Sequence, residues 1–170
     1  GEHADGHDFL TAAAANGAAA ALVSHEPGPV SCPLLMVDDV EAALARLGAF
    51  GRAAHRMAGG HLVAVTGSVG KTGSKEMLAH MLRRLGGCHA NRASFNNHLG
   101  VPLTLAALPD APLPAVQEIG MNAPGEIRTL STLAQPDIAV ITRIADSHAG
   151  FFDSLDGIAG AKAEIFDGLT

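Results

Sequence analysis

The sequence is poor in aromatic residues: it contains no tryptophan or tyrosine, and aromatic side chains make up only 4% of its 170 residues. Proteins that bind single-stranded nucleic acid usually stack the bases on such side chains. The net charge of −6 at pH 7 also leaves no excess of positive charge for a phosphate backbone. These two deficits argue against a nucleic-acid partner.

Cysteines and long apolar runs are scarce as well. Cys32 and Cys88 are far apart and show no metal-ligand spacing, which favours a reducing, cytoplasmic compartment. No apolar run approaches the ~20 residues of a membrane-spanning helix, and the first residues lack the basic and apolar segments of a signal peptide. We therefore expect a cytoplasmic protein that has no membrane partner.

What is present is an alternation of helical and strand patterns in a sequence that is 48% hydrophobic. This alternation predicts an α/β fold with a mainly parallel sheet. We expect a helix over residues 9–16, strands over 19–23 and 34–37, and a second helix that starts at a capping box of Asp38 and Glu41. Because the first residues are loop-like and include no initiating methionine, we expect a fragment of a longer protein.

The second helix ends at a short glycine-rich segment over residues 57–60. This segment predicts a linker between a partial α/β domain over residues 1–57 and part of a second domain over residues 58–170. The length and apolar content are enough for one good core or two small ones.

A glycine loop between an apolar strand and a helix is the most informative feature. Residues 62–65 suit a buried strand, and Gly67 and Gly70 allow backbone conformations in which amide N–H groups converge on an anion. Lys71 adds a positive charge, and the helix that Thr72 opens directs its positive end toward the loop. The G-x-x-G-K-T pattern is shorter than the usual phosphate-binding loop. It predicts a nucleotide site, although an ordinary strand-to-helix turn with a surface lysine also fits. The candidate cofactor-binding residues are Gly67, Ser68, Val69, Gly70, Lys71 and Thr72.

The helix after this loop carries apolar residues at helical spacing, which predicts a buried face. Gly86 follows the last of them and is expected to end the helix. The residues of this expected face are Met77, Leu78, Met81, Leu82 and Leu85.

Polar side chains follow two later strands at their carboxyl ends. Glu118 lies near the end of a strand over 115–119, and His148 lies just past an apolar run over 138–144 that we expect to be covered on both faces. Open α/β sheets bind ligands at this edge, so Thr72, Glu118 and His148 could together surround a divalent ion such as Mg²⁺. Taken singly, Glu118 could instead cap a helix and His148 could be an ordinary loop residue.

Other polar residues have less definite roles. Asn96 and Asn97 can hydrogen-bond a ligand or cap the helix that follows at Pro102, and their sequence context alone favours capping. The histidines do not form i, i+4 pairs on a helix face, so exposed or structural roles are expected for them. They include His3, His7, His25, His55 and His61.

Lys162 lies inside the apolar stripe of the last helix, which we expect Asp153 or Ser154 to cap and which runs through Leu169. Glu164 is expected to point away from this stripe. A charged lysine in such a place can pack its methylenes and extend its ammonium group to water. The stripe consists of Leu155, Ile158, Ile165, Phe166 and Leu169.

Four sequence motifs resemble those of the Mur ligases and occur in the same order as in that family. The resemblance extends along essentially the whole chain. Two positions depart from the family pattern: Gly73 stands where Ser or Thr is usual, and Gly150 stands where an acidic residue is frequent. The motifs are Thr66-Gly-Ser-Val-Gly-Lys-Thr72 with Lys75-Glu76, Ser94-Phe-Asn-Asn97 with Gly100-Val-Pro-Leu-Thr104, Glu118-Ile-Gly-Met-Asn122 with Pro124-Gly-Glu-Ile127, and Ala161-Lys-Ala-Glu-Ile-Phe166.

The resemblance implies a partial UDP-sugar-binding domain over residues 1–57 and a partial P-loop-type ATP-binding domain over 58–170. The third, C-terminal domain of the family would lie outside these residues. The implied cofactors are ATP and Mg²⁺, and the protein would act as a monomer. The implied catalytic residues are Lys71, Lys162 and His148; the metal ligands Thr72, Glu118, His148 and a carbamylated Lys162; and the substrate-binding residues Asn96 and Asn97.

The activity that the resemblance implies is ATP-dependent amide-bond formation in peptidoglycan precursor synthesis. UDP-N-acetylmuramoyl-tripeptide would be activated as an acyl phosphate, which the amine of D-alanyl-D-alanine would then capture. Two alternatives stay open. One is another ligase of the superfamily, including the type that adds glutamate to folate. The other is a nucleotide-binding fragment without turnover, for which phosphate release would be absent.

Overall fold

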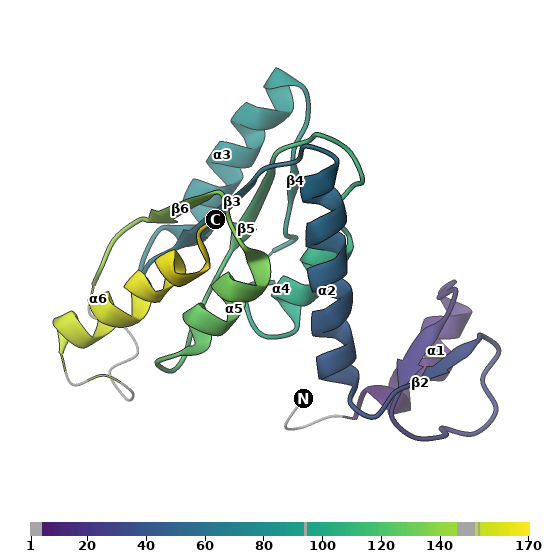
Figure 1. Ribbon diagram of the computed structural model, residues 1–170. Helices are drawn as coiled ribbons and strands as arrows, with labels where there is room; N and C mark the ends of the chain where they lie inside the picture. The colour runs from purple at the N-terminus through teal and green to yellow at the C-terminus, as the bar shows by residue number, and fades with distance from the viewer. Residues whose placement is uncertain (1–4, 94, 146–151, 153) are drawn as a thin grey trace. The chain divides into compact units, whose positions relative to one another are not determined.

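The computed structural model describes residues 5–93, 95–145, 152 and 154–170, and the chain divides into two compact units, Gly1–Ala43 and Leu44–Thr170 (Figure 1). This division falls earlier than the linker expected at residues 57–60. Helix α2 (Val40–Met57) explains the difference, because its Arg52 and His55 are buried within the second unit. The helices in the described part of the chain are too short or too polar to cross a lipid bilayer.

The first unit contains a short helical segment and a pair of parallel strands. Its elements are η1 (Gly6–Phe9), α1 (Leu10–Ala15), β1 (Ala21–Val23) and β2 (Leu34–Met36). The capping box predicted for the next helix is wrong in detail. Asp39, rather than Asp38, caps α2, because its Oδ1 accepts the backbone N–H groups of Glu41 and Ala42 at 2.8 and 3.0 Å.

The second unit contains a four-stranded parallel sheet in the order β4-β5-β3-β6, which confirms the predicted α/β class. The strand after residue 138 is shorter than predicted and is not covered on both faces. It ends at Ile141, and Ile138 is 55% exposed, because β6 is an edge strand of the described sheet. The strands are β3 (Leu62–Thr66), β4 (His89–Ala90), β5 (Ala115–Glu118) and β6 (Ile138–Ile141).

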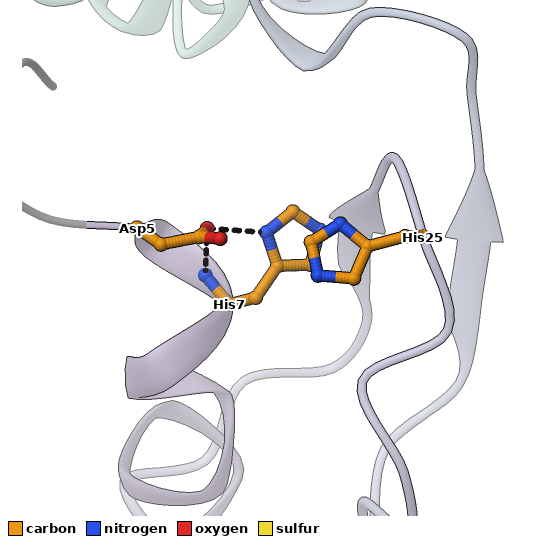
Figure 2. Close-up of side chains that lie close together, drawn as sticks. All are labelled: Asp5, His7 and His25. Atoms are coloured by element: carbon orange, nitrogen blue, oxygen red, sulfur yellow. Dashed lines mark hydrogen bonds and ion pairs between the residues drawn. The ribbon is translucent and has the colours of Figure 1, made fainter.

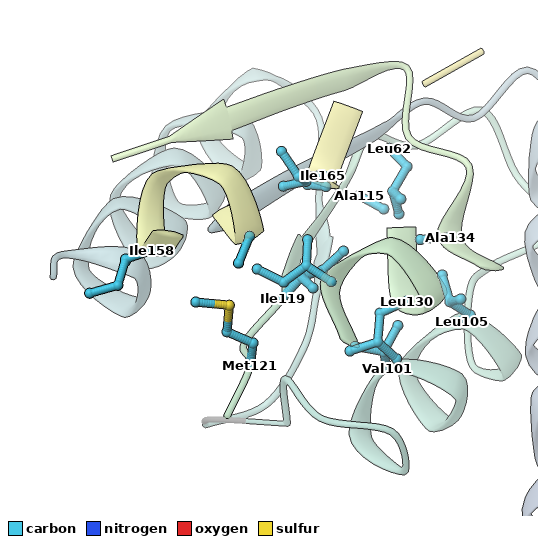
Figure 3. Packing of buried hydrophobic residues seen from close by; sticks show 13 residues of the cluster. Leu62, Val101, Leu105, Ala115, Ile119, Met121, Leu130, Ala134, Ile158 and Ile165 are labelled. Carbon is cyan, nitrogen blue, oxygen red and sulfur yellow. The ribbon is translucent and has the colours of Figure 1, made fainter. Parts of the chain in front are cut away.

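One face of this sheet packs against helices from the second half of the chain. Leu62 and Ala64 of β3 contribute to a buried cluster together with residues of α4, α5, α6 and η2, as Figure 3 shows. Residues 63 and 65 alternate to the opposite face, where α3 contacts β3 and β5. The sheet therefore lies between two helical layers. These helices are α3 (Lys71–Leu85), α4 (Gly100–Ala106), α5 (Glu126–Ala134), α6 (Leu155–Ala163) and the 3₁₀ helix η2 (Glu164–Gly168).

The buried face of α3 overlaps only partly with the one that its apolar spacing predicted, because Leu78 and Leu82 are half-buried but the other three residues are not. Met77, Met81 and Leu85 are exposed by 67%, 57% and 84%, whereas Lys75 and Ala79 are fully buried. The buried ammonium group of Lys75 is satisfied, because it donates to two backbone carbonyls and pairs with Glu76. The small side chain of Ala79 fits against the sheet. The hydrogen bonds of Lys75 and the small size of Ala79 therefore explain which face of α3 is buried.

Buried polar residues join α2 to the rest of the second unit. Arg52 donates to the carbonyl oxygens of Ala134 and Gln135 and pairs with Asp137 at 2.7 Å. Asp137 in turn accepts the backbone N–H of Leu62 at the start of β3. This network therefore ties α2 and the segment after α5 to the first residue of β3.

His55 predicts how the stability of this unit depends on pH. Its buried ring donates from Nε2 to the carbonyl of Leu113 at 2.7 Å, and burial lowers the pKa of His55 below the ordinary 6.5. As the pH falls, the unfolded chain therefore becomes protonated at His55 at a higher pH than the folded chain does. The contribution to stability is fully present above about pH 6.5 and is lost as the pH falls through the lowered pKa, with a slope of at most ~1.4 kcal/mol per pH unit for one histidine.

We expect His55→Gln to make this loss of stability shallower, because glutamine can donate to Leu113 without titrating. Denaturant unfolding at several pH values between about 5 and 8 measures the effect. His80→Gln is the control, since His80 is exposed on α3. Burial also lowers the pKa of His89, so part of the slope should persist in the His55 variant. Equal slopes in the two variants and the parent chain would contradict the assignment.

Candidate functional site

The predicted phosphate loop, residues 67–72, connects β3 to α3 and is held against the end of β6. Gly67 and Gly70 have φ angles of +148° and +88°, which other residues rarely adopt. A side chain on Gly67 would also collide with Thr142 Oγ1. That hydroxyl donates to the carbonyl of Val69 at 2.7 Å, so it fixes the turn from the neighbouring strand. The conformation of the loop therefore depends on both glycines and on the adjacent edge strand.

Lys71 lies at the first position of α3 and bends back over this loop. Its Nζ donates to the carbonyl of Gly67 at 2.7 Å, and the backbone N–H of Ser68 donates to the carbonyl of Arg143 at the same distance. A phosphate bound here would accept hydrogen bonds from the Lys71 amine and the Ser68 N–H in place of these two carbonyls. The amino end of α3 and the lysine both favour an anion at this point. Gly73, in the first turn of α3, has open space around its Cα, so packing does not require glycine there.

Glu118 meets the phosphate loop at the carboxyl edge of the sheet. The register places Glu118 opposite Val65, just before the loop begins. Its buried carboxylate accepts the Thr72 hydroxyl at 2.8 Å and the Asn96 side-chain amide at 2.7 Å. Within the described residues these side-chain donors are neutral, so the negative charge of Glu118 is available to a hard cation. Thr72 and Glu118 are thus brought together as the sequence predicted.

Asn91 was missed by the sequence reasoning, although it supports Glu118 directly. Its Oδ1 accepts the backbone N–H of Glu118 at 2.9 Å, and Lys75 Nζ donates to its carbonyl at 3.0 Å. These contacts fasten the segment after β4, which carries Asn96, to both α3 and β5. Local sequence patterns give no signal for this role, because both partners of Asn91 are distant in sequence.

The two neighbouring asparagines have different roles. Asn97 caps α4, because its Oδ1 accepts the backbone N–H of Gly100 at 2.9 Å, whereas Asn96 contacts Glu118. The helix accordingly starts at Gly100, before Pro102. Both asparagines line a cavity of about 430 Å³ that also contacts Lys71. The cavity is continuous with the phosphate loop and is large enough for part of a substrate.

Lys162 is fully buried in the second unit, with Ile158 and Ile165 on its own stripe. Its Nζ has no hydrogen-bond partner among the described residues, so the ammonium group does not extend to water. Burial, followed by repulsion from Lys71, lowers the pKa of Lys162 to about 8. A buried amine of this kind next to a second lysine favours an anionic partner or the neutral form.

The last helix begins with a cap that the sequence predicted but ends earlier than expected. Ser154 caps α6 by accepting the N–H of Gly157 at 3.1 Å, and Asp153 lies outside the described residues. The α-helix ends at Ala163 and continues as η2, so Glu164 does not point away as expected. It is buried and accepts the backbone N–H groups of Gly125 and Arg128, which anchors the start of α5. Three members of the expected stripe are instead largely exposed: Leu155, Phe166 and Leu169.

His148 and Gly150 lie outside the described residues. The proposed metal-ligand and catalytic roles of His148 therefore stay predictions. The described part of the site consists of the phosphate loop, Thr72, Glu118, the asparagine pair and Lys162.

This arrangement has a counterpart among known proteins, since residues 65–170 match the family profile described as the Mur ligase middle domain. The chain belongs to the Mur ligase family. Two relatives are UDP-N-acetylmuramoyl-tripeptide–D-alanyl-D-alanine ligases: the Bacillus subtilis protein is 43% identical over 99% of this chain, and the Escherichia coli protein 41% identical over 99%. This Mur ligase chain spans 37% and 36% of their respective lengths.

Solved structures of Mur ligases show the same fold. A MurF structure from Acinetobacter baumannii superposes with a TM-score of 0.84 at 40% identity and covers 100% of this chain and 37% of that one. The MurF ligase of Thermotoga maritima, solved in complex with ADP, gives a TM-score of 0.79 at 30% identity over 100% of this chain and 39% of its own. The predicted α/β architecture and family resemblance are therefore confirmed.

Proposed function

We propose that this chain forms the nucleotide-binding part of an ATP-dependent ligase that joins D-alanyl-D-alanine to UDP-N-acetylmuramoyl-tripeptide. The observation that carries the proposal is the hydrogen bond between Thr72, which follows Lys71 at the start of α3, and the buried carboxylate of Glu118 at the carboxyl edge of the sheet. The buried, unpartnered amine of Lys162, whose pKa the charge of Lys71 helps to lower, supports it. The names of the relatives support the substrate pair. We place this activity in the cytoplasm and in a monomer, as the sequence led us to expect.

Different residues of this site would bind the phosphates, the metal ion and the substrate during phosphoryl transfer. Lys71 and the amino end of α3 would bind the β- and γ-phosphates of ATP, and Thr72 and Glu118 would hold Mg²⁺, which supplies charge neutralisation and alignment. The buried carboxylate and the hydroxyl are hard oxygen ligands, so the described residues fit this ion. His148 is a further proposed ligand. Asn96 would position both Glu118 and the bound substrate, and Asn97 lines the same cavity.

The substrate carboxylate would attack the γ-phosphate and form an acyl phosphate with release of ADP. The amine of D-alanyl-D-alanine would then attack the acyl carbon, with phosphate as the leaving group. Lys71 offsets the charge that the transferred phosphoryl group carries in both steps. The cavity beside Lys71 provides a place for the acyl end of the substrate.

Nucleotide binding without turnover is the second candidate for these 170 residues, because they span only 37% of the Bacillus subtilis ligase. Phosphate release from ATP distinguishes the two. It should require both UDP-N-acetylmuramoyl-tripeptide and D-alanyl-D-alanine in a full-length protein that contains this chain. Release that depends on a different amino acid, or on a folate, would indicate another ligase of the superfamily.

Glu118→Gln should preserve the fold but weaken Mg²⁺-dependent turnover by about 100-fold or more. Glutamine can accept from Asn96 through its oxygen and donate to Thr72 through its amide, so both hydrogen bonds survive while the charge is lost. Steady-state phosphate release across a Mg²⁺ titration measures the effect. Asp110→Asn is the control, because Asp110 is an exposed carboxylate that does not line this cavity. An unchanged Mg²⁺ dependence in the Glu118 variant would remove it from the metal site.

A further inference from the structure

A cluster of side chains of metal-ligating types lies in the first unit, and we assign it no step of the proposed ligase chemistry. Asp5, His7 and His25 each present one ligand atom, and these atoms all lie within 4.8 Å of one another. Figure 2 shows them converging from η1 and from the turn after β1. Two imidazoles and a carboxylate are a common set for a divalent transition metal.

The hydrogen bonds of this group already orient His7. Asp5 Oδ1 lies 2.6 Å from His7 Nδ1, and the backbone N–H of Ser24 donates to His7 Nε2 at 3.0 Å. Nε2 is therefore the acceptor, and Nδ1 is protonated and donates its hydrogen bond to the Asp5 carboxylate. Hydrogen bonds from His7 lower the pKa of Asp5, so the carboxylate is ionised at neutral pH.

His25 completes the group without being tied to it by a hydrogen bond. Its ring stacks on His7 with a centroid distance of 3.8 Å, and within the described residues it has no hydrogen-bond partner. His25 is exposed, so its ring can turn to present a nitrogen lone pair without disturbing the interior. The stacked position keeps it within reach of the Asp5–His7 pair.

We propose that Asp5, His7 and His25 bind a divalent transition-metal ion of the Zn²⁺ class, which replaces the proton shared by Asp5 and His7. The ion binds Nδ1 of His7, and the proton of the ring moves from Nδ1 to Nε2. The backbone N–H of Ser24 then donates to water instead of to Nε2, because Ser24 is exposed. Imidazole ligands select Zn²⁺ over Mg²⁺, which prefers oxygen. This site is therefore distinct in chemistry from the oxygen-rich edge at Glu118.

A metal at this site would connect two separate segments of the first unit, η1 and the turn after β1. Because the ion would bind the folded unit through both segments at once, it would stabilise the folded unit increasingly as its concentration rises above the Kd.

Zn²⁺ titration of the chelator-treated 170-residue chain tests the proposal, with excess Mg²⁺ present to fill the other site. We expect binding of a single tight equivalent, weakened at least ~10-fold in His25→Ala and in Asp5→Asn. His80→Ala is the matched control, because it removes an exposed histidine from α3. Both test residues are exposed, and circular dichroism checks that the variants fold.

A second measurement separates ligation from chance binding to the nine histidines of the sequence. Cu²⁺ bound to the parent chain should show coupling to two imidazole nitrogens in its electron paramagnetic resonance spectrum, and to one in His25→Ala. The proposal is overturned if the parent binds no tight equivalent of Zn²⁺. It is also overturned if His25→Ala binds as tightly as the parent, or if His80→Ala weakens binding equally.

Discussion

Replacing Lys71 by alanine should abolish ATP-dependent ligation in a full-length protein that contains this chain, with a loss of at least about 100-fold in kcat. The phosphate loop positions this amine at the amino end of α3, where its Nζ lies within 2.7 Å of the Gly67 carbonyl. The neighbouring Lys75 cannot replace it, because its ammonium group is fully buried and held by Asn91, Ala93 and Glu76. Lys162 cannot replace it either, because it is buried on a different helix, α6.

The measurement pairs phosphate release by the full-length protein with ATP binding by the 170-residue chain. Arg84→Ala is the matched control, since it removes one positive charge from the exposed last turn of α3. Lys71→Ala should weaken nucleotide binding, whereas Arg84→Ala should leave both readouts near those of the parent. Near-normal turnover in the Lys71 variant would exclude the phosphate loop from the mechanism.

Lys162→Ala and Lys162→Arg should both be nearly inactive, although arginine keeps the positive charge. The reason is that we propose a carbamate on Lys162, which would present a carboxylate to a second Mg²⁺. The neutral amine attacks carbon dioxide, an N–C bond forms, and the nitrogen releases one proton. Arginine cannot undergo this reaction at neutral pH, because its guanidinium stays protonated.

The surroundings of Lys162 favour this chemistry. Burial and the charge of Lys71 lower the pKa of Lys162 to about 8, so roughly a quarter of the amine is neutral at pH 7.5, against about a thousandth for an ordinary lysine. The buried Nζ also has no hydrogen-bond partner in the part of the chain that the structure describes. The negative charge of the carbamate would turn the electrostatic repulsion between Lys162 and Lys71 into an attraction.

Two measurements test the carbamate. Carbon-13 nuclear magnetic resonance of the chain in labelled bicarbonate should show a carbamate signal that is lost in Lys162→Arg. In the full-length protein, a small added carboxylate such as acetate should partly restore Lys162→Ala and should not restore Lys71→Ala. Full activity of the arginine variant would exclude the carbamate.

Local rules determined a large part of this protein before any tertiary contact is considered. The G-x-x-G-K-T pattern predicted the strand, loop and helix at residues 62–85, because Gly67 and Gly70 adopt positive φ angles that glycine tolerates. Alternating patterns predicted the parallel α/β class, and strand ends predicted that Thr72 and Glu118 would share one edge. Spacing alone also placed Lys162 on a buried stripe with Ile158 and Ile165.

Tertiary structure decided which face of each helix is buried and which polar groups find partners. Helical spacing favoured Met77, Met81 and Leu85 for the interior of α3, but Lys75 is buried instead because backbone carbonyls from the distant segment at residues 91–93 satisfy its charge. The turn into η2 likewise brings Glu164 to the amino end of α5. Such pairings join residues far apart in sequence, so their energies depend on a register and packing that no local periodicity contains.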